Sequence, residues 1–248
     1  MNVKELQIWL NAKIKQNNLN LKPLVVDSVG GPATRNAIYE VFKCKTAKAV
    51  TETELNKYAL QLGDTNTKRI KAIGKVETSG NSWFSDGTSK ILYERHYFYK
   101  FVRKTIYLPG YKDHFLATQK WGGYTTDFNK NSINDSWEKL AHAACIDPIG
   151  AFSSVSISSF QVMGIYYKEL GYSNPIDMLY EVTRDESVHY KLLVGFILNV
   201  AKIKNSFLKL SSNPETNRAF CKAYNGPSYA SIAPGYHVKL AKELSKIG

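Results

Sequence analysis

The sequence predicts a mainly α-helical protein with one small β-hairpin. Apolar residues recur every three or four positions through most of the 248 residues, which is the spacing of one helix face. One segment, "NSWFSDGTSKILY" (81–93), instead contains Asp86-Gly87, a strong turn signal for a hairpin. We find no internal repeat and no low-complexity segment in the sequence.

The first two helices are expected over residues 3–15 and 33–42, each with apolar residues on one face. A turn from Asp27 to Pro32 separates them. Pro32 suits the opening of the second helix, because proline lacks the N–H group that a first helical residue leaves unbonded.

Two more helices precede the hairpin. "TETELNKYALQLG" begins with a capping-box pattern from Thr51 to Glu54 and closes on Gly63. "NTKRIKAIGKVETSG" is expected to form a helix that carries Glu77 where the pattern runs out into Thr78-Ser79-Gly80. From Glu94 onward the chain reads as mostly helical. The predicted helices there are 135–146, 148–156, 159–170, 174–182, 184–203, 214–223 and 236–246.

The composition is that of a soluble globular protein, with 44% hydrophobic and 22% charged residues. No apolar run approaches the roughly 20 residues needed to cross a bilayer. The start, "MNVKELQIWLNAKIK", carries charges and amides in place of the apolar core of a signal peptide. The three cysteines, Cys44, Cys145 and Cys221, are widely separated and lack metal-ligand spacing. We therefore expect reduced thiols and no bound metal.

The net charge of +12 favours polyanionic partners such as nucleic acid, anionic lipid or the bacterial envelope. The lysines are scattered from Lys4 to Lys246 and form no compact basic run. The charge therefore indicates a class of partner and no mechanism.

The N-terminal pattern of helix, Gly-rich loop and "GPATRNAI" helix resembles the small three-helix peptidoglycan-binding domain of many cell-wall hydrolases. Matching positions are Leu6-Gln7, Asp27, Gly31-Pro32 and Thr34, whereas Ser28 stands where glycine is usual. The resemblance implies a wall-binding domain over residues 1–45, with Asp27, Gly31 and Thr34 in its binding loop. A generic helical hairpin is the alternative.

The rest of the chain, from about residue 51, resembles the phage and prophage N-acetylmuramidase family. Four motifs match in order: "VETSG", "FSDG" with "ILYERHYFY", "SISSFQVMG", and "YNGP" near the end. Ile157-Ser158 stands where the family has Trp-Gly, and Tyr166 where Asn is common. The resemblance implies a lysozyme-like helical catalytic domain over residues 51–248 that cleaves peptidoglycan.

Cleavage of a β-1,4 glycosidic bond needs a proton donor at the leaving oxygen and a group that stabilises an oxocarbenium-like state. We expect Glu77 to be this general acid, in an apolar pocket beside Trp83, Phe84 and Tyr93 that raises its pKa.

The second catalytic group is left open by the sequence. Glu94 is a base, a stabilising carboxylate or a structural partner of Arg95 or another cation. Asp86 orients water or makes the hairpin turn. His96 is expected to pack or to hydrogen-bond beside the site.

Further residues are expected to bind the saccharide through amide, hydroxyl and phenol groups. Their alternative reading is a role in turns and packing. They are Gln161, Ser158, Tyr224, Asn225, Tyr93 and His96.

We therefore expect a modular phage-type endolysin that hydrolyses the bond between N-acetylmuramic acid and N-acetylglucosamine without a cofactor. The expected partner is peptidoglycan, with no nucleic acid, no stable membrane insertion and a monomeric state. The enzyme would wait in the host cytoplasm for a holin-type pore before reaching the periplasm. The alternatives are a lytic transglycosylase, which forms a 1,6-anhydro product, and a non-catalytic wall-binding protein.

Overall fold

The structure is a computed structural model that describes residues 1–77, 82–102, 115–122, 134–226 and 228–247. The described chain divides into two compact units, each made of two segments. One contains Met1–Thr46 and Trp83–Thr183, and the other contains Ala47–Ser82 and Arg184–Gly248. The mainly helical class is confirmed in both units.

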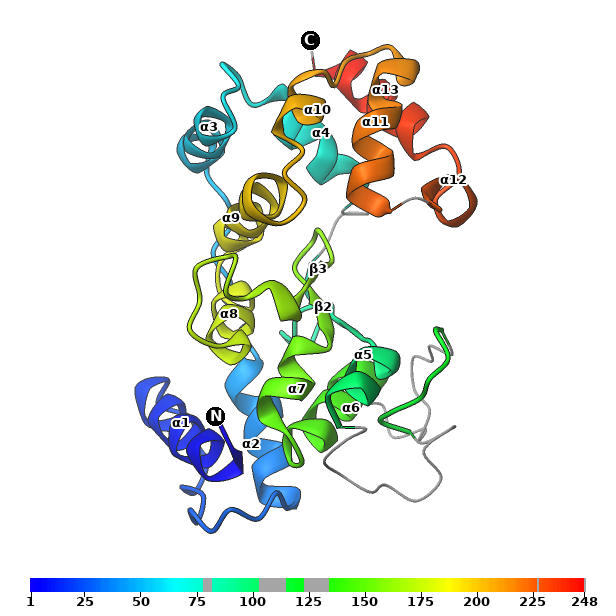
Figure 1. Ribbon diagram of the computed structural model, residues 1–248. Helices are drawn as coiled ribbons and strands as arrows, with labels where there is room; N and C mark the ends of the chain where they lie inside the picture. The colour runs from blue at the N-terminus through cyan, green and yellow to red at the C-terminus, as the bar shows by residue number, and fades with distance from the viewer. Residues whose placement is uncertain (78–81, 103–114, 123–133, 227, 248) are drawn as a thin grey trace. The chain divides into compact units, whose positions relative to one another are not determined.

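The first unit combines helices with a small antiparallel sheet of strand order β1-β2-β3 (Figure 1). Its elements are α1 (Val3–Gln16), α2 (Pro32–Phe42), β1 (Leu92–Tyr93), α5 (Arg95–Val102), α6 (Asp135–Ala144), α7 (Pro148–Ser153), β2 (Val155–Ile157), β3 (Val162–Met163), the 3-10 turn η1 (Gly164–Tyr166) and α8 (Pro175–Val182).

The N-terminal helices share the core of this unit. Phe42, fully buried near the end of α2, contacts Trp137 of α6 and Phe152 of α7 at ring-centroid distances of 5.7 and 5.3 Å. Trp9 of α1 donates its indole N–H to Asp177 of α8 over 2.8 Å. Residues 1–46 therefore pack directly on residues 83–183, while the division into domains 1–45 and 51–248 stays a prediction.

The second unit is helical in its described part. Its elements are α3 (Glu52–Gln61), α4 (Lys68–Glu77), α9 (Glu186–Gly195), the π-helical turn η2 (Phe196–Val200), α10 (Lys204–Leu208), α11 (Pro214–Asn225), α12 (Tyr229–Ile232) and α13 (Tyr236–Lys246). The expected capping box of α3 is present, since Thr51 and Glu54 bond each other's backbone N–H groups. Helix α13 packs against both α4 and α11.

The expected helix over 159–170 is wrong. Ser156 and Ile157 of β2 pair with Met163 and Val162 of β3, so this stretch forms a strand and a 3-10 turn. Ser158, with φ of +67°, and Gln161, with φ of +51°, also have left-handed backbones that a continuous helix excludes. The preceding helix consequently ends at Ser153 instead of residue 156.

The expected turn at Asp86-Gly87 is confirmed. Gly87 has φ of +90°, which suits glycine, and the Phe84 N–H donates to the Thr88 carbonyl over 2.8 Å. Only one isolated bridge, between Trp83 and Ser89, joins the two sides among the described residues, and Tyr93 pairs with Val155 of β2. The turn is therefore local, while the strand after it belongs to the three-stranded sheet.

Gly164 closes the "QVMG" motif for a packing reason. A Cβ atom at this position would lie 2.1 Å from the backbone carbonyl oxygen of Phe152. We expect Gly164→Ala to lower the free energy of unfolding by roughly 2–4 kcal/mol, because a backbone group must move. Chemical denaturation measures this loss. Gly31→Ala is the control, since no atom lies within 4 Å of its Cβ position. Equal stability of the two variants would contradict the packing argument.

Among the residues that the structure describes, no helix is both long and apolar enough to cross a membrane.

Candidate active site

Glu77 is the last residue of α4, as expected, while Thr78–Gly80 lie outside the described residues. Its side chain is half-buried. Burial raises the pKa of the Glu77 carboxyl to about 7, because a low-dielectric surrounding disfavours the charged form. A large part of the Glu77 population therefore carries a proton at neutral pH.

Tyr236 holds the Glu77 carboxyl in place. The Tyr236 hydroxyl donates a hydrogen bond of 2.5 Å to Oε1 of Glu77. This bond favours the charged carboxylate and partly opposes the effect of burial on its pKa. Tyr236 begins α13, directly after Gly235, whose φ of +79° is left-handed. Burial raises the pKa of the Tyr236 phenol, so it stays a donor at neutral pH.

An aromatic stack from α11 continues this site. Tyr224 stacks on Tyr236 at a ring-centroid distance of 6.4 Å and on Phe220 at 5.2 Å. Burial raises the pKa of Tyr224 well above its usual value, and the Glu77 charge acts in the same direction. Burial also raises the pKa of Cys221 to about 12. Neutral phenols and a neutral thiol therefore surround Glu77, an arrangement suited to a carboxylic acid that donates a proton.

The structure places Tyr224 beside Glu77, while its predicted role in saccharide binding stays a prediction, and it identifies Tyr236 as a residue that sequence reasoning missed. Tyr236 lies within "YNGPSYASIAPGYHVKLAKEL", but no sequence pattern marks which of its tyrosines reaches Glu77. Asn225, at the end of α11, donates a weak bond of 3.4 Å to the Cys221 carbonyl, and Gly226 follows with φ of +89°.

We expect Tyr236→Phe to move the alkaline limit of activity to higher pH. Removing the hydroxyl removes the bond that stabilises the Glu77 carboxylate. The pKa of Glu77 therefore rises above about 7, and its carboxyl stays protonated up to a higher pH. The pH profile of wall cleavage measures this shift. Tyr172→Phe, which removes a phenol bond to Glu181, is the control. An alkaline limit that is unchanged or lower in Tyr236→Phe would contradict this role.

Glu94 occupies the junction between β1 and α5 in the first unit. The residue is only 8% exposed, and its Oε2 lies 3.3 Å from Nδ1 of His96. The Glu94 carbonyl accepts bonds from the N–H groups of Tyr97 and Phe98, which fixes the start of α5. Burial lowers the pKa of His96, and the charge of Lys100 lowers it further. His96 is therefore mainly neutral at pH 7, and Glu94 Oε2 faces a ring nitrogen of a neutral imidazole.

The remaining predicted residues near the hairpin have structural contacts. Asp86 Oδ1 accepts bonds from the N–H and hydroxyl of Thr88, at 2.9 and 2.7 Å. These bonds support the alternative in which Asp86 makes the turn. The Tyr93 ring is 1% exposed and packs on Phe98, so it lies in the core. The Trp83 indole N–H donates to the Thr183 carbonyl over 2.9 Å.

Ser158 and Gln161 lie in the loop that joins β2 to β3. The buried Ser158 hydroxyl accepts a bond of 3.2 Å from the Phe160 N–H, and this bond stabilises the loop. Gln161 is exposed, and its amide donates back to the Ser158 carbonyl over 3.3 Å. Of the two, only Gln161 presents its side chain to solvent.

Gln7 organises the predicted wall-binding loop. Its amide nitrogen donates to Oδ1 of Asp27 over 2.8 Å and to Oγ1 of Thr34 over 3.4 Å, while its oxygen accepts from the Ser28 N–H over 3.0 Å. The Gln7 bond also holds the pKa of Asp27 below its usual value. Gly31 caps α2. The motif residues therefore build the loop through contacts with one another.

Ser28 has φ of +67°, which explains why glycine is usual at this position. Beside it lies an open pocket of about 540 Å³, lined by Ser28, Lys4 and Asp147 among others. A Cβ atom on Gly30 would lie 2.3 Å from Cβ of Cys145, so the loop rests against the end of α6. Among the described residues, no group of three or more acidic, His or Cys side chains has the arrangement of a metal site.

Comparison with known proteins gives two findings. The family model for muramidase, described as N-acetylmuramidase, matches residues 66–248. Among solved structures, the crystal structure of the Burkholderia AP3 phage endolysin is similar in fold, with a TM-score of 0.66 and 24% sequence identity. The alignment covers 98% of this chain and 93% of that one. No curated protein matches the chain.

Proposed function

Because the chain belongs to the N-acetylmuramidase family, a family of peptidoglycan glycosidases, we propose that it is a phage-type endolysin with Glu77 as its general acid. The observation that carries the mechanistic part is the environment of Glu77. Burial raises its pKa to about 7, and the Tyr236 hydroxyl fixes its orientation. A carboxyl with this pKa is half protonated at pH 7 and can donate to a leaving oxygen.

In the proposed reaction, Glu77 protonates the glycosidic oxygen as the bond to the muramic acid carbon breaks. The developing oxocarbenium-like charge needs an anionic or water-activating group. We assign this second role to Glu94, because its carboxylate is buried and fixed beside the mainly neutral His96. Asp86 is less suited to this role, since the Thr88 bonds engage its Oδ1 oxygen in the turn.

Substrate contacts are proposed for residues that offer polar groups at the surface of each unit. Gln161 presents an exposed amide from the β2–β3 loop, and Asn225 presents a half-exposed amide at the end of α11. Tyr224, which lies beside Glu77, is proposed as a contact through the half-exposed part of its side chain. Ser158 contributes by shaping the loop that carries Gln161, since its own side chain is buried.

The nature of the product tests the proposed reaction. We expect purified peptidoglycan digested by the protein to release muropeptides with reducing N-acetylmuramic acid ends, each carrying the mass of one added water. Mass spectrometry distinguishes these from the 1,6-anhydro products of a lytic transglycosylase, which lack that water. Anhydro products would show that the protein is a lytic transglycosylase and not a hydrolase. Peptidoglycan that stays intact would indicate a non-catalytic wall-binding protein.

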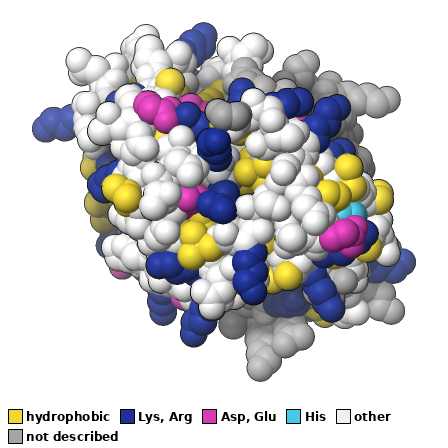
Figure 2. All heavy atoms as spheres, turned by 90° about the horizontal axis from the view of Figure 1, so that it is seen from above, with side chains coloured by type: hydrophobic (Ala, Val, Ile, Leu, Met, Phe, Trp, Pro, Cys, Tyr) yellow, Lys and Arg dark blue, Asp and Glu magenta, His cyan; other side chains and the backbone are white. Residues whose placement is uncertain are grey.

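Wall binding is proposed for the loop built by Asp27, Gly31 and Thr34 and for the pocket beside Ser28. The charge of +12 supports attraction to an anionic wall. Figure 2 shows Lys and Arg side chains distributed over one face of the molecule, with fewer acidic groups among them.

We propose that the enzyme stays in the host cytoplasm until a holin-type pore gives it access to the wall.

We expect Lys4→Glu to reduce binding to the wall, because it reverses a charge on the lining of the pocket beside the loop. Pelleting with purified peptidoglycan, in an inactive Glu77→Gln background, should fall about threefold at low salt and less at high salt. Lys22→Glu, an exposed lysine outside this pocket, is the matched control. Equal pelleting by the two variants would remove the pocket from the proposal.

A further inference from the structure

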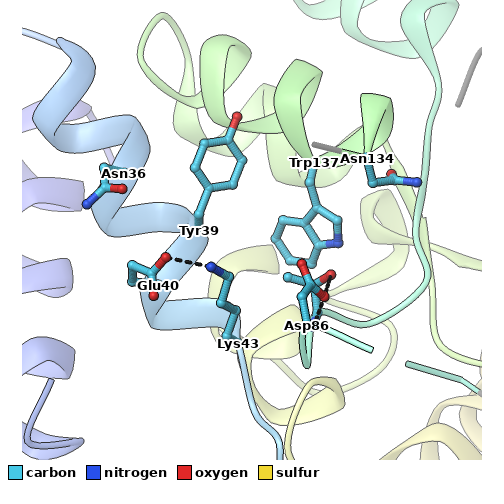
Figure 3. Close-up of a pocket in the computed structure, with 8 residues that line it drawn as sticks. Asn36, Tyr39, Glu40, Lys43, Asp86, Asn134 and Trp137 are labelled. Carbon is cyan, nitrogen blue, oxygen red and sulfur yellow. Dashed lines mark hydrogen bonds and ion pairs between the residues drawn. The ribbon is translucent and has the colours of Figure 1, made fainter. Parts of the chain in front are cut away.

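A second polar pocket lies in the first unit, between α2, the Asp86 turn and the start of α6. Its volume is about 260 Å³ (Figure 3). It is lined by Asn36, Tyr39, Glu40, Lys43, Asp86, Thr88, Asn134 and Trp137. The α2 residues occupy successive turns of one helix face, so a single stripe of α2 forms one wall. None of the residues assigned to proton donation lines this pocket.

The pocket carries charges of both signs. Lys43 contacts Glu40 with an Nζ–Oε1 distance of 2.5 Å; an ammonium has three donors, so among the described residues two of them remain for a ligand. Asp86 contributes a carboxylate from the turn, and its side chain is exposed. Both Thr88 bonds go to Oδ1 of Asp86, so within the described part of the chain Oδ2 remains to accept a bond from a ligand. Figure 3 shows Asp86 beside the Trp137 ring, and Glu40 of α2 together with Lys43, the residue that follows this helix.

Amide groups complete the lining. Asn134 uses its Oδ1 to cap α6 by accepting the Ser136 N–H over 3.1 Å, so its amide N–H₂ group is directed elsewhere. Asn36 is exposed on α2. The Trp137 ring is held rigidly, because its indole N–H donates to the Ser89 carbonyl over 2.8 Å. The pocket therefore offers a fixed floor, one cation, two carboxylates and two amides.

We propose that this pocket binds a zwitterionic amino-acid group of the peptidoglycan stem peptide, with its ammonium on Asp86 and its carboxylate on Lys43. A ligand that carries both charges on one carbon matches a lining that carries both charges. The volume of about 260 Å³ lies below the usual range for ligand pockets, about 300–1,000 Å³, so it suits one amino-acid residue and not an oligosaccharide. This inference rests on the proposed function only in naming peptidoglycan as the source of the ligand.

Isothermal titration of the full chain tests the proposal, in the Glu77→Gln background so that no wall bond is cleaved. The probe is the tripeptide N-acetyl-L-alanyl-γ-D-glutamyl-meso-diaminopimelate, in which the only free amine is on the terminal residue, on the same carbon as a free carboxylate. We expect the Kd to rise at least about tenfold for Asp86→Asn, for Lys43→Gln, and for the tripeptide acetylated on its free amine, because each change removes a charge-assisted bond. Asp86→Asn keeps an oxygen for Thr88, so the turn is retained.

Lys22→Gln is the matched control for the loss of one positive charge, and it should leave the Kd unchanged. Chemical-shift changes should include the Trp137 indole N–H. The proposal is overturned if the tripeptide fails to bind, if acetylation leaves the Kd unchanged, or if N-acetylchitotriose perturbs Trp137 in place of the tripeptide. Cleavage of the wall by the native protein is measured separately. Cleavage without tripeptide binding rejects the inference alone, whereas binding without cleavage rejects the proposed reaction.

Discussion

Glu77→Gln is expected to lower the rate of peptidoglycan cleavage by about 10²–10⁴-fold, the usual contribution of general acid catalysis. The amide keeps the shape of the side chain and still accepts the Tyr236 hydroxyl, but it has no acidic proton to donate. The measurement is turbidity loss of outer-membrane-permeabilised bacteria at equal protein concentration. Glu215→Gln on the exposed face of α11 is the control and should retain full activity.

The same variant should be at least as stable as the native protein at alkaline pH. Burial raises the pKa of Glu77 from 4.5 to about 7, so between these values the folded state binds more protons than the unfolded state. The free energy of unfolding contributed by this group therefore decreases as pH rises from about 4.5 through 7. Glu77→Gln removes that loss, so its stability relative to the native protein should increase over this window. Denaturation at pH 4.5 and pH 8 measures the difference.

Substantial wall cleavage by folded Glu77→Gln protein would overturn the assignment of the general acid. A fall in activity that accompanies a lowered melting temperature would instead indicate a structural role for the Glu77–Tyr236 pair. The two outcomes are distinguishable, because circular dichroism and activity are measured on the same preparation.

Glu94→Gln is expected to reduce wall cleavage by about 10²-fold with a small change in melting temperature. His96 is mainly neutral at pH 7 because burial lowers its pKa, so its contact with Glu94 is not a strong ion pair. The amide oxygen can still accept a bond from the imidazole. Activity and thermal melting, measured together, separate catalysis from stability.

Glu181→Gln provides a matched control in the same unit, since the Glu181 carboxylate also accepts a side-chain hydrogen bond, from Tyr172 over 2.7 Å. A large fall in the melting temperature of Glu94→Gln, with activity retained at low temperature, would make Glu94 a structural partner of His96. The stabilising role in the reaction would then belong to another group.

Local chemistry in the sequence determined most of the helices and the place of Glu77 at a helix end. Proline at the start of α2 and the Thr51–Glu54 capping box at the start of α3 act through neighbouring backbone groups. A few consecutive residues are therefore enough to predict where each helix begins. Glu77 was assigned to a helix end by the same kind of reasoning. The ordered motifs around it pointed to the N-acetylmuramidase family, to which the chain belongs.

Only the tertiary structure decided what surrounds that acid. Tyr236 lies 159 residues from Glu77, and no periodicity or cap connects residues so far apart. The pairing of β2 with β3 overrode the helical reading of residues 159–170, because two left-handed backbone positions and a sheet partner outweigh local spacing. The need for glycine at position 164 also comes from a tertiary contact, because the Phe152 carbonyl leaves no room for a Cβ atom. Contacts of this kind depend on packing between distant segments, and packing sets both the pKa of Glu77 and the charges that meet in the pocket on α2.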